Sequence, residues 1–81
     1  MRQIERIQTG LRMERRIIKV LKATAEYLDI STAELVEAMA LHAFEGKSPF
    51  SEKTLAKIAR IREVYELDLT ADDSHHLAEK E

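Results

Sequence analysis

Hydrophobic and polar residues alternate along the first part of the chain, between Arg6 and Met13. A period of two is typical of a strand with one buried and one exposed face. The pattern therefore predicts a strand over residues 6–13, with a helical extension or a flexible arm as the alternative interpretation. The side chains expected on its buried face are Ile7, Thr9, Leu11 and Met13. Those expected on its outer face are Arg6, Gln8, Gly10 and Arg12.

The period then changes to that of a helix. Apolar residues spaced by three and four positions, among them Ile17 and Leu21, predict a first helix over residues 15–28. The start of this helix is weakly signalled, because Glu14 is not a preferred cap.

A second helix has the clearest start in the sequence. Ser31 and Glu34 have the spacing of a capping box, in which each side chain can satisfy a backbone N–H group of the other residue. The helix is predicted to run to about Phe44, and Gly46 supplies its end. Its apolar stripe consists of Leu35, Met39, His42 and Ala43.

A third helix is predicted after a linker at residues 47–51. It opens at Pro49 or Ser51 and runs to about Leu67, because apolar residues recur there at spacings of three and four. Residues 70–73 offer a start for one last short helix, although an acidic chain end is expected to fray. The fold class expected is mostly α, with one strand, two core helices and a C-terminal helix.

The length and composition favour association with a second copy. The chain has 81 residues and no cysteine, so a small core gains no help from disulfides or thiolate metal sites. A single strand also leaves its backbone donors and acceptors unpaired. We therefore expect a homodimer in which the two strands form an antiparallel ribbon across a two-fold axis. The expected dimer core consists of Ile7, Thr9, Leu11, Met13, Leu35 and Met39.

Charge is segregated along the chain, although the net charge is only −2. Residues 1–22 carry a balance of +5, residues 23–46 of −5, residues 47–62 of +4 and residues 63–81 of −6. A basic leading segment on an acidic chain indicates a localised anionic partner. A two-stranded ribbon fits the major groove of DNA, where arginine pairs with guanine edges and glutamine with adenine edges.

The order of these parts resembles the ribbon-helix-helix superfamily of Arc-, MetJ- and CopG-like repressors. The resemblance is carried by residues 7–13 (IQTGLRM), by the helix that contains Ile17, Ile18 and Leu21, and by residues 28–35 (LDISTAEL). It covers about residues 6–45. It implies a dimer whose ribbon reads bases through Gln8, Gly10 and Arg12. It also implies a phosphate at the N-terminus of the second helix, held by Ser31, Thr32 and Ala33, and we expect Arg6 at the DNA backbone as well.

Two positions depart from the family pattern. Gly10 occupies the central outward position, where the family usually has a side chain that can touch a base, so central base reading is in doubt. Asp29 stands in the turn between the helices, where the family often has glycine. This departure is mild, because aspartate tolerates the left-handed conformation better than most residues.

Other classes of function find little support in the sequence. No nucleophile motif or glycine-rich phosphate loop is present, so we expect no enzyme and no cofactor. Asp72 and His76 have a spacing that can bind a metal, but no further ligand lies nearby and we expect no metal site. No apolar run is long enough to span a membrane, and the first residues lack a signal core, so a cytoplasmic protein is expected.

The sequence thus predicts a homodimeric, sequence-specific DNA-binding transcriptional regulator of the repressor type. Residues 1–46 would form the dimerisation and DNA-binding domain, and residues 47–81 a C-terminal helical extension with an acidic tail. One alternative is an antitoxin, or another protein-interaction module, whose residues 47–81 bind a toxin or other partner protein. Another is a helical dimer that has lost DNA binding.

Overall fold

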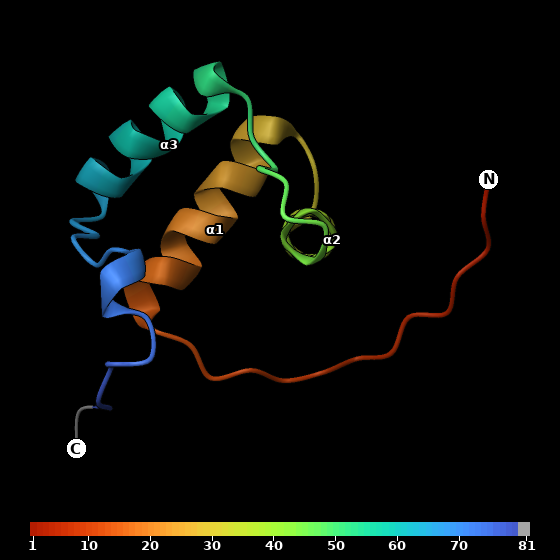
Figure 1. Ribbon diagram of the computed structural model, residues 1–81, viewed down its shortest axis with the longest axis horizontal. Helices are drawn as coiled ribbons and strands as arrows, with labels where there is room; N and C mark the ends of the chain where they lie inside the picture. Colours follow the sequence, from red (N-terminus) through yellow and green to blue (C-terminus); the bar gives the residue numbers. More distant parts are fainter. Residues whose placement is uncertain (80–81) are drawn as a thin grey trace.

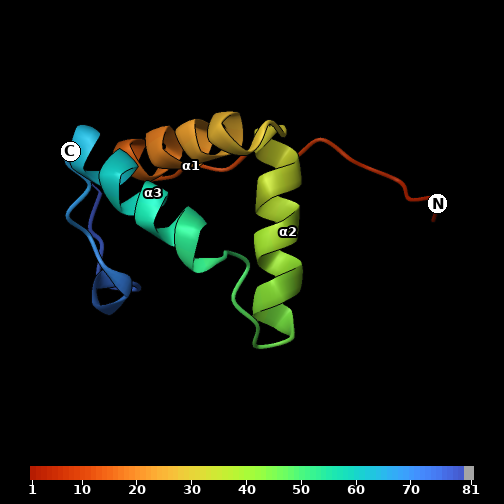
Figure 2. The ribbon, with the colours of Figure 1, turned by 90° about the horizontal axis from the view of Figure 1, so that it is seen from above.

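Three helices surround a small core in the computed structural model, which describes residues 1–79 (Figure 1). The elements are α1 (Arg15–Leu28), α2 (Thr32–Phe44), α3 (Glu52–Val64) and the short 3₁₀ helix η1 (Ala71–Asp73). Both α2 and α3 pack against α1. Figure 2 shows that α2 runs across the end of α1 rather than alongside it.

The predicted strand is absent from the structure, and the fold class expected from the sequence is wrong. Residues 1–14, which we call the N-terminal arm, contain neither strand nor helix and run as an extended chain from the start of α1 past α2 (Figure 1). Residues 1–79 are therefore all-α, and no N-terminal strand precedes the two core helices. The physical reason is that a strand requires backbone hydrogen bonds to a neighbouring strand, and this chain supplies no neighbour. The alternating pattern indicated an extended backbone at residues 6–13, but a pattern within one segment does not show whether a second strand is present to pair with it.

The bounds of α1 are those that the sequence predicted, but its start is better capped than expected. The Glu14 carboxylate accepts hydrogen bonds from the backbone N–H groups of Arg16, at 2.9 Å, and Ile17, at 3.1 Å. These bonds satisfy donors that every helix leaves open at its first turn. At the other end Asp29 adopts the left-handed conformation with φ 62°, as expected for this turn. The N–H of Ile30 then donates to the carbonyl of Ala25 at 3.0 Å and closes the helix.

The start and end of α2 also follow the sequence. The Ser31 hydroxyl oxygen accepts from the Glu34 N–H at 3.1 Å, which confirms the cap. The Glu34 carboxylate, however, accepts from the Ser31 hydroxyl at 3.3 Å rather than from the Ser31 backbone N–H. Gly46 ends the helix with φ 69°, and the Lys47 N–H donates to the His42 carbonyl at 2.8 Å.

The third helix is shorter than predicted. Its cap is Ser51, whose hydroxyl oxygen accepts from the Thr54 N–H at 3.2 Å, and it ends at Val64 rather than near Leu67. It is attached to α1 partly by Lys57, whose Nζ lies 5.5 Å from the centre of the Tyr27 ring. The short helix η1 follows where the sequence offered a last helix start.

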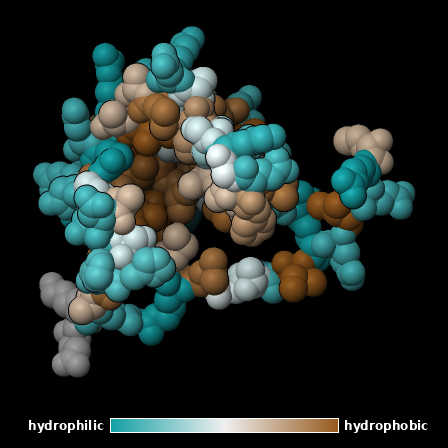
Figure 3. Space-filling model, viewed as in Figure 1, coloured by the Kyte–Doolittle hydropathy of each residue, from teal (hydrophilic) through white to brown (hydrophobic). Residues whose placement is uncertain are grey.

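The buried core is very small. Its members are Val20, Thr24 and Ala25 of α1 and Leu35 of α2. Figure 3 shows apolar side chains gathered in the space that the three helices face. No residue of α3 is buried. The described chain therefore leaves much of its apolar surface in contact with water.

Leu35 should contribute more to stability than any other side chain of α2, because it is only 2 % exposed. Leu35→Ala is expected to lower the free energy of unfolding by about 2–5 kcal/mol, through lost burial and the cavity left behind. Chemical denaturation followed by circular dichroism measures this loss. Leu77→Ala, at an exposed position, is the control and should change little. Equal losses in the two variants would contradict the core described above.

Candidate nucleic-acid interface

The N-terminal arm holds most of the residues predicted to contact DNA. All side chains of residues 1–13 are exposed, including those expected on a buried face: Ile7 is 83 % and Leu11 is 70 % exposed. Around Gly10 the space that a Cβ atom would need is open, and its backbone has no positive φ. Within the described chain the arm therefore presents both of its faces to solvent.

Arg6 attaches the arm to α2. Its guanidinium donates from Nε and Nη2 to the two carboxylate oxygens of Glu37, each at 2.9 Å. These hydrogen bonds, together with the attraction of opposite charges, lower the pKa of the Glu37 carboxyl and raise that of Arg6. The nearby charge of Glu34 also raises the pKa of Arg6. The structure therefore brings Arg6, a predicted DNA-backbone contact, close to the first turns of α2.

The start of α2 is the second predicted DNA-backbone contact. The N–H groups at a helix N-terminus and the helix dipole favour an anion, and Ser31 and Ala33 are exposed there while Thr32 is half-buried. The Glu34 carboxylate lies against the Ser31 hydroxyl in the same turn. This negative charge opposes a bound phosphate, so the anion site at this helix end is weaker than the sequence motif suggested.

Arg12 is the most exposed arginine that makes an ion pair. Its guanidinium contacts the carboxylate of Glu79 near the end of the described chain. The other two predicted base-reading positions, Gln8 and Gly10, are exposed. The base-reading set therefore faces solvent, and its one charged member is paired with the C-terminal segment.

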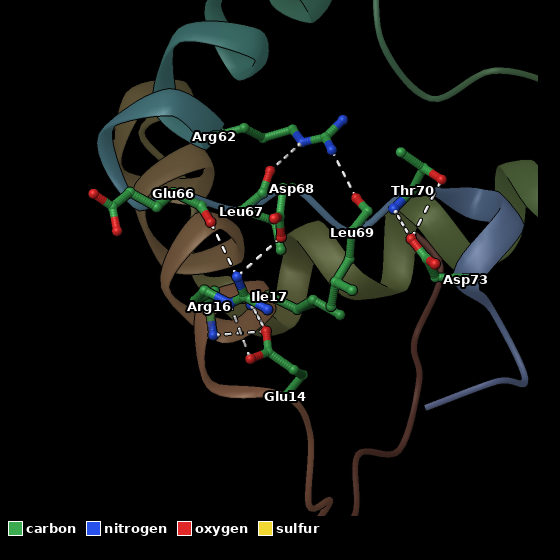
Figure 4. A network of polar contacts seen from close by, with 10 residues as sticks. All are labelled: Glu14, Arg16, Ile17, Arg62, Glu66, Leu67, Asp68, Leu69, Thr70 and Asp73. Carbon is green, nitrogen blue, oxygen red and sulfur yellow. Dashed lines mark hydrogen bonds and ion pairs between the residues drawn. The ribbon is translucent and has the colours of Figure 1, made fainter. Parts of the chain in front are cut away.

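A polar network at the start of α1 was missed from the sequence (Figure 4). The Arg16 guanidinium donates to the Glu14 carboxylate at 3.2 Å, to the Asp68 carboxylate at 3.0 Å and to the Glu66 carbonyl at 3.1 Å. The hydrogen bonds to Glu14 and Asp68, and the charges of these two carboxylates, raise the pKa of Arg16. The hydrogen bonds from Arg16 and from the helix N–H groups lower the pKa of Glu14 against the opposing effect of burial. In the sequence, the only indication of this contact is that residues 1–22 carry a net positive charge and residues 63–81 a net negative charge.

Arg62 completes the network from α3. It donates from Nε to the Leu67 carbonyl at 3.3 Å and from Nη2 to the Leu69 carbonyl at 2.7 Å (Figure 4). Both acceptors are backbone carbonyls, so these bonds fix the course of the chain from Leu67 to Leu69.

The residues predicted for a dimer core lie in three different environments. Leu35 is already buried within its own chain. Met39 is half-buried and lines a small apolar cleft of about 80 Å³ between the helices. The arm residues Ile7, Thr9, Leu11 and Met13 are exposed.

On the outside of α2, further apolar side chains are exposed as well, of which Phe44, at 82 %, is the most open.

Other kinds of site are poorly developed in residues 1–79. A shallow depression of about 420 Å³ runs past the end of α3, lined by Ala59, Arg62, Glu63, Glu66, Leu67 and Asp68. In this part of the chain no three side chains of the metal-ligating types come together. None of the helices described combines the length and the apolar character that crossing a membrane requires.

Comparison with protein-family models, with curated proteins and with solved structures finds no match to this chain. What the protein does is therefore inferred from its residues and their geometry.

Glu37 should control whether the arm stays attached to α2. Glu37→Gln removes the charge that holds Arg6, so we expect faster motion of residues 2–10 in backbone NMR relaxation. Lowering the pH should have the same effect. The lowered pKa means that the contact is fully present above the ordinary carboxyl pKa and is lost as the pH falls through the lower, folded-state value. Glu26→Gln, at an exposed position of α1, is the control of equal charge. An arm equally ordered in all three proteins would contradict this role.

Proposed function

We propose that the protein is a homodimeric DNA-binding regulator that contacts double-stranded DNA through its N-terminal arm. The observation that carries the proposal is an extended, exposed segment with polar and basic side chains at alternate positions, Arg6, Gln8 and Arg12, interrupted only by Gly10. The basic balance of the first 22 residues supports an anionic partner. The extended backbone is narrow enough to enter a DNA groove, and its side chains are of the types that recognise base edges.

The spacing of the arm side chains suits DNA. Alternate residues of an extended chain lie roughly 6.6 Å apart, because each residue advances about 3.3 Å. This separation is close to two base-pair steps of about 3.4 Å. In the proposed complex Gln8 and Arg12 read bases that lie on either side of the Gly10 position. Gly10 leaves a gap that lets the backbone approach the DNA closely.

Arg6 and the start of α2 would hold the sugar-phosphate backbone. The proximity of Arg6 to the first turns of α2 supports one shared phosphate contact, because the Arg6 guanidinium and the N–H groups at Ser31, Thr32 and Ala33 all favour an anion. Glu37 is the acceptor of Arg6 in the free protein. In the proposed complex a phosphate replaces this carboxylate. Such contacts position the protein without reading sequence.

A second copy would cover the apolar surface that one chain leaves exposed. Helices that are apolar on most sides are normally buried, and α2 carries Val36, Leu41 and Phe44 on its exposed surface. The exposed apolar side chains of the arm, led by Ile7 and Leu11, add to this surface. A core of four buried residues is small for 81 residues. Burial of the arm and of the outer α2 surface against a second copy would compensate for the small core.

The second candidate function is a protein-interaction module of the antitoxin type. The observation that favours it is α3, which has no buried residue and exposes Leu55 and Val64. A toxin or other partner protein would then bind residues 47–81. A small toxin reading frame beside the gene would favour this candidate, and the two functions are compatible in one protein.

Dimerisation predicts that stability depends on protein concentration. The thermal unfolding midpoint should rise with concentration, because each ten-fold increase favours association by about 1.4 kcal/mol. Leu11→Asp places a charge on the proposed interface and should abolish this dependence, whereas Leu77→Asp should retain it. Calorimetry and sedimentation over a hundred-fold range of concentration measure both effects. A folded, stable monomer at micromolar concentration would contradict the dimer.

Base reading predicts a position-specific loss on changing Arg12. With the best duplex selected from random DNA, Arg12→Ala should cost about 1–3 kcal/mol of binding free energy and relax the preference at one base per half-site. Arg60→Ala, at an exposed position of α3, is the control of equal charge. Ser31→Ala should weaken binding to all sequences alike and also lower the stability of the fold by about 1 kcal/mol. Mobility-shift titrations at two salt concentrations separate these effects. If Arg12→Ala binds selected and random duplexes as the parent does, the arm does not read DNA.

A further inference from the structure

The chain beyond α3 turns back toward the start of α1. Glu66 adopts the left-handed conformation with φ 55°, and the Leu67 N–H donates to the Arg62 carbonyl at 2.9 Å. The Arg62 guanidinium then holds the carbonyls of Leu67 and Leu69. Figure 1 shows the result: the last part of the described chain lies beside the point where the arm joins α1. Specific hydrogen bonds, and not only the attraction between charges, therefore hold the chain after α3 near the start of α1.

The returning part is strongly acidic. Residues 66–79, which we call the acidic segment, contain five acidic and no basic residues. Two of its carboxylates make contacts with the basic start of the chain: Asp68 pairs with Arg16 at 3.0 Å, and Glu79 pairs with Arg12. Arg12 is exposed on the arm, and Arg16 lies in the first turn of α1, which follows the arm in the sequence. The acidic segment therefore occupies cationic groups at the base of the arm.

We propose that the acidic segment is an autoinhibitory element that competes with DNA for Arg12 and Arg16; this inference rests on the DNA-binding function proposed above. The Glu79 carboxylate opposes DNA binding at Arg12, because it occupies guanidinium donors that a base edge would use and its charge repels the phosphates next to that base. A duplex that approaches the arm also meets the negative charge of Asp68 beside Arg16. Both ion pairs lie at the surface, so each is weak and easily exchanged. The segment lowers affinity for every duplex and leaves selectivity to the arm.

The competition predicts tighter binding when the two contacting carboxylates lose their charge. The double variant Asp68→Asn, Glu79→Gln should bind random and selected duplexes about three- to ten-fold more tightly than the parent at low salt. The gain should shrink as salt rises, because salt screens the ion pairs. The matched control is the double variant Glu63→Gln, Asp72→Asn, which changes the net charge equally at exposed positions that make no ion pair in residues 1–79. Fluorescence anisotropy with labelled duplexes measures all three proteins.

The outcomes separate this proposal from the DNA-binding function. A larger gain for the contact variant than for the control supports autoinhibition through these two pairs. Equal gains in the two variants, or no gain in either, would show that DNA binds but that the contacts do not restrain it, which overturns the autoinhibition alone. If none of the three proteins binds any duplex at low salt, the DNA-binding function itself fails and the autoinhibition fails with it. Circular dichroism establishes that the variants keep the helical fold.

Discussion

The packing of Leu35 against the buried side of α1 is the contact on which the positions of the other elements depend. Leu35 lines the same apolar cleft as Val20 and Thr24 of α1 and Ile58 of α3. Because α2 and α3 each pack on α1, this one helix determines where both of them lie. The position of α2 determines where Glu37 meets Arg6, and the position of α3 determines where Arg62 turns the chain back. The polar contacts at the surface thus depend on a few buried apolar atoms.

Three arginines of the N-terminal region, Arg6, Arg12 and Arg16, form ion pairs with carboxylates from distant parts of the sequence. Glu37 of α2 pairs with Arg6, and the acidic segment supplies Asp68 and Glu79. Charges that alternate in blocks along the sequence therefore meet in space. An anionic ligand binds such a surface by exchanging one anion for another, so its net gain is smaller than the number of arginines suggests. The same arrangement favours ligands with many regularly spaced charges, because a single anion replaces only one carboxylate.

The helices were predictable because their ends are determined locally. Ser31, Gly46 and Asp29 act through hydrogen bonds and backbone conformations within a few residues, and the structure has the first two helices where the sequence placed them. Glu14 was misjudged for a related reason, since its longer side chain caps α1 in a way that average preferences do not anticipate.

The absence of the strand predicted at residues 6–13 could not be foreseen from the local pattern, because strand formation depends on a second strand and the pattern does not show whether one is available. The contact of Arg16 with Asp68 likewise joins residues 52 positions apart. Periodicity carries no information about contacts over such separations, so the predicted site residues Gln8, Gly10 and Arg12 could be placed on the arm but their partners could not be named.

The small core also determines how the chain responds to heat. The heat capacity gained on unfolding comes mainly from apolar surface that becomes newly hydrated. With Val20, Ala25 and Leu35 as its only buried apolar residues among those described, a single chain hydrates little new surface when it unfolds. We therefore expect a broad thermal transition, because the unfolding enthalpy of so small a core is small, and a flat stability curve, because its heat-capacity change is small. A larger heat-capacity change in calorimetry would therefore report surface covered between chains rather than within one.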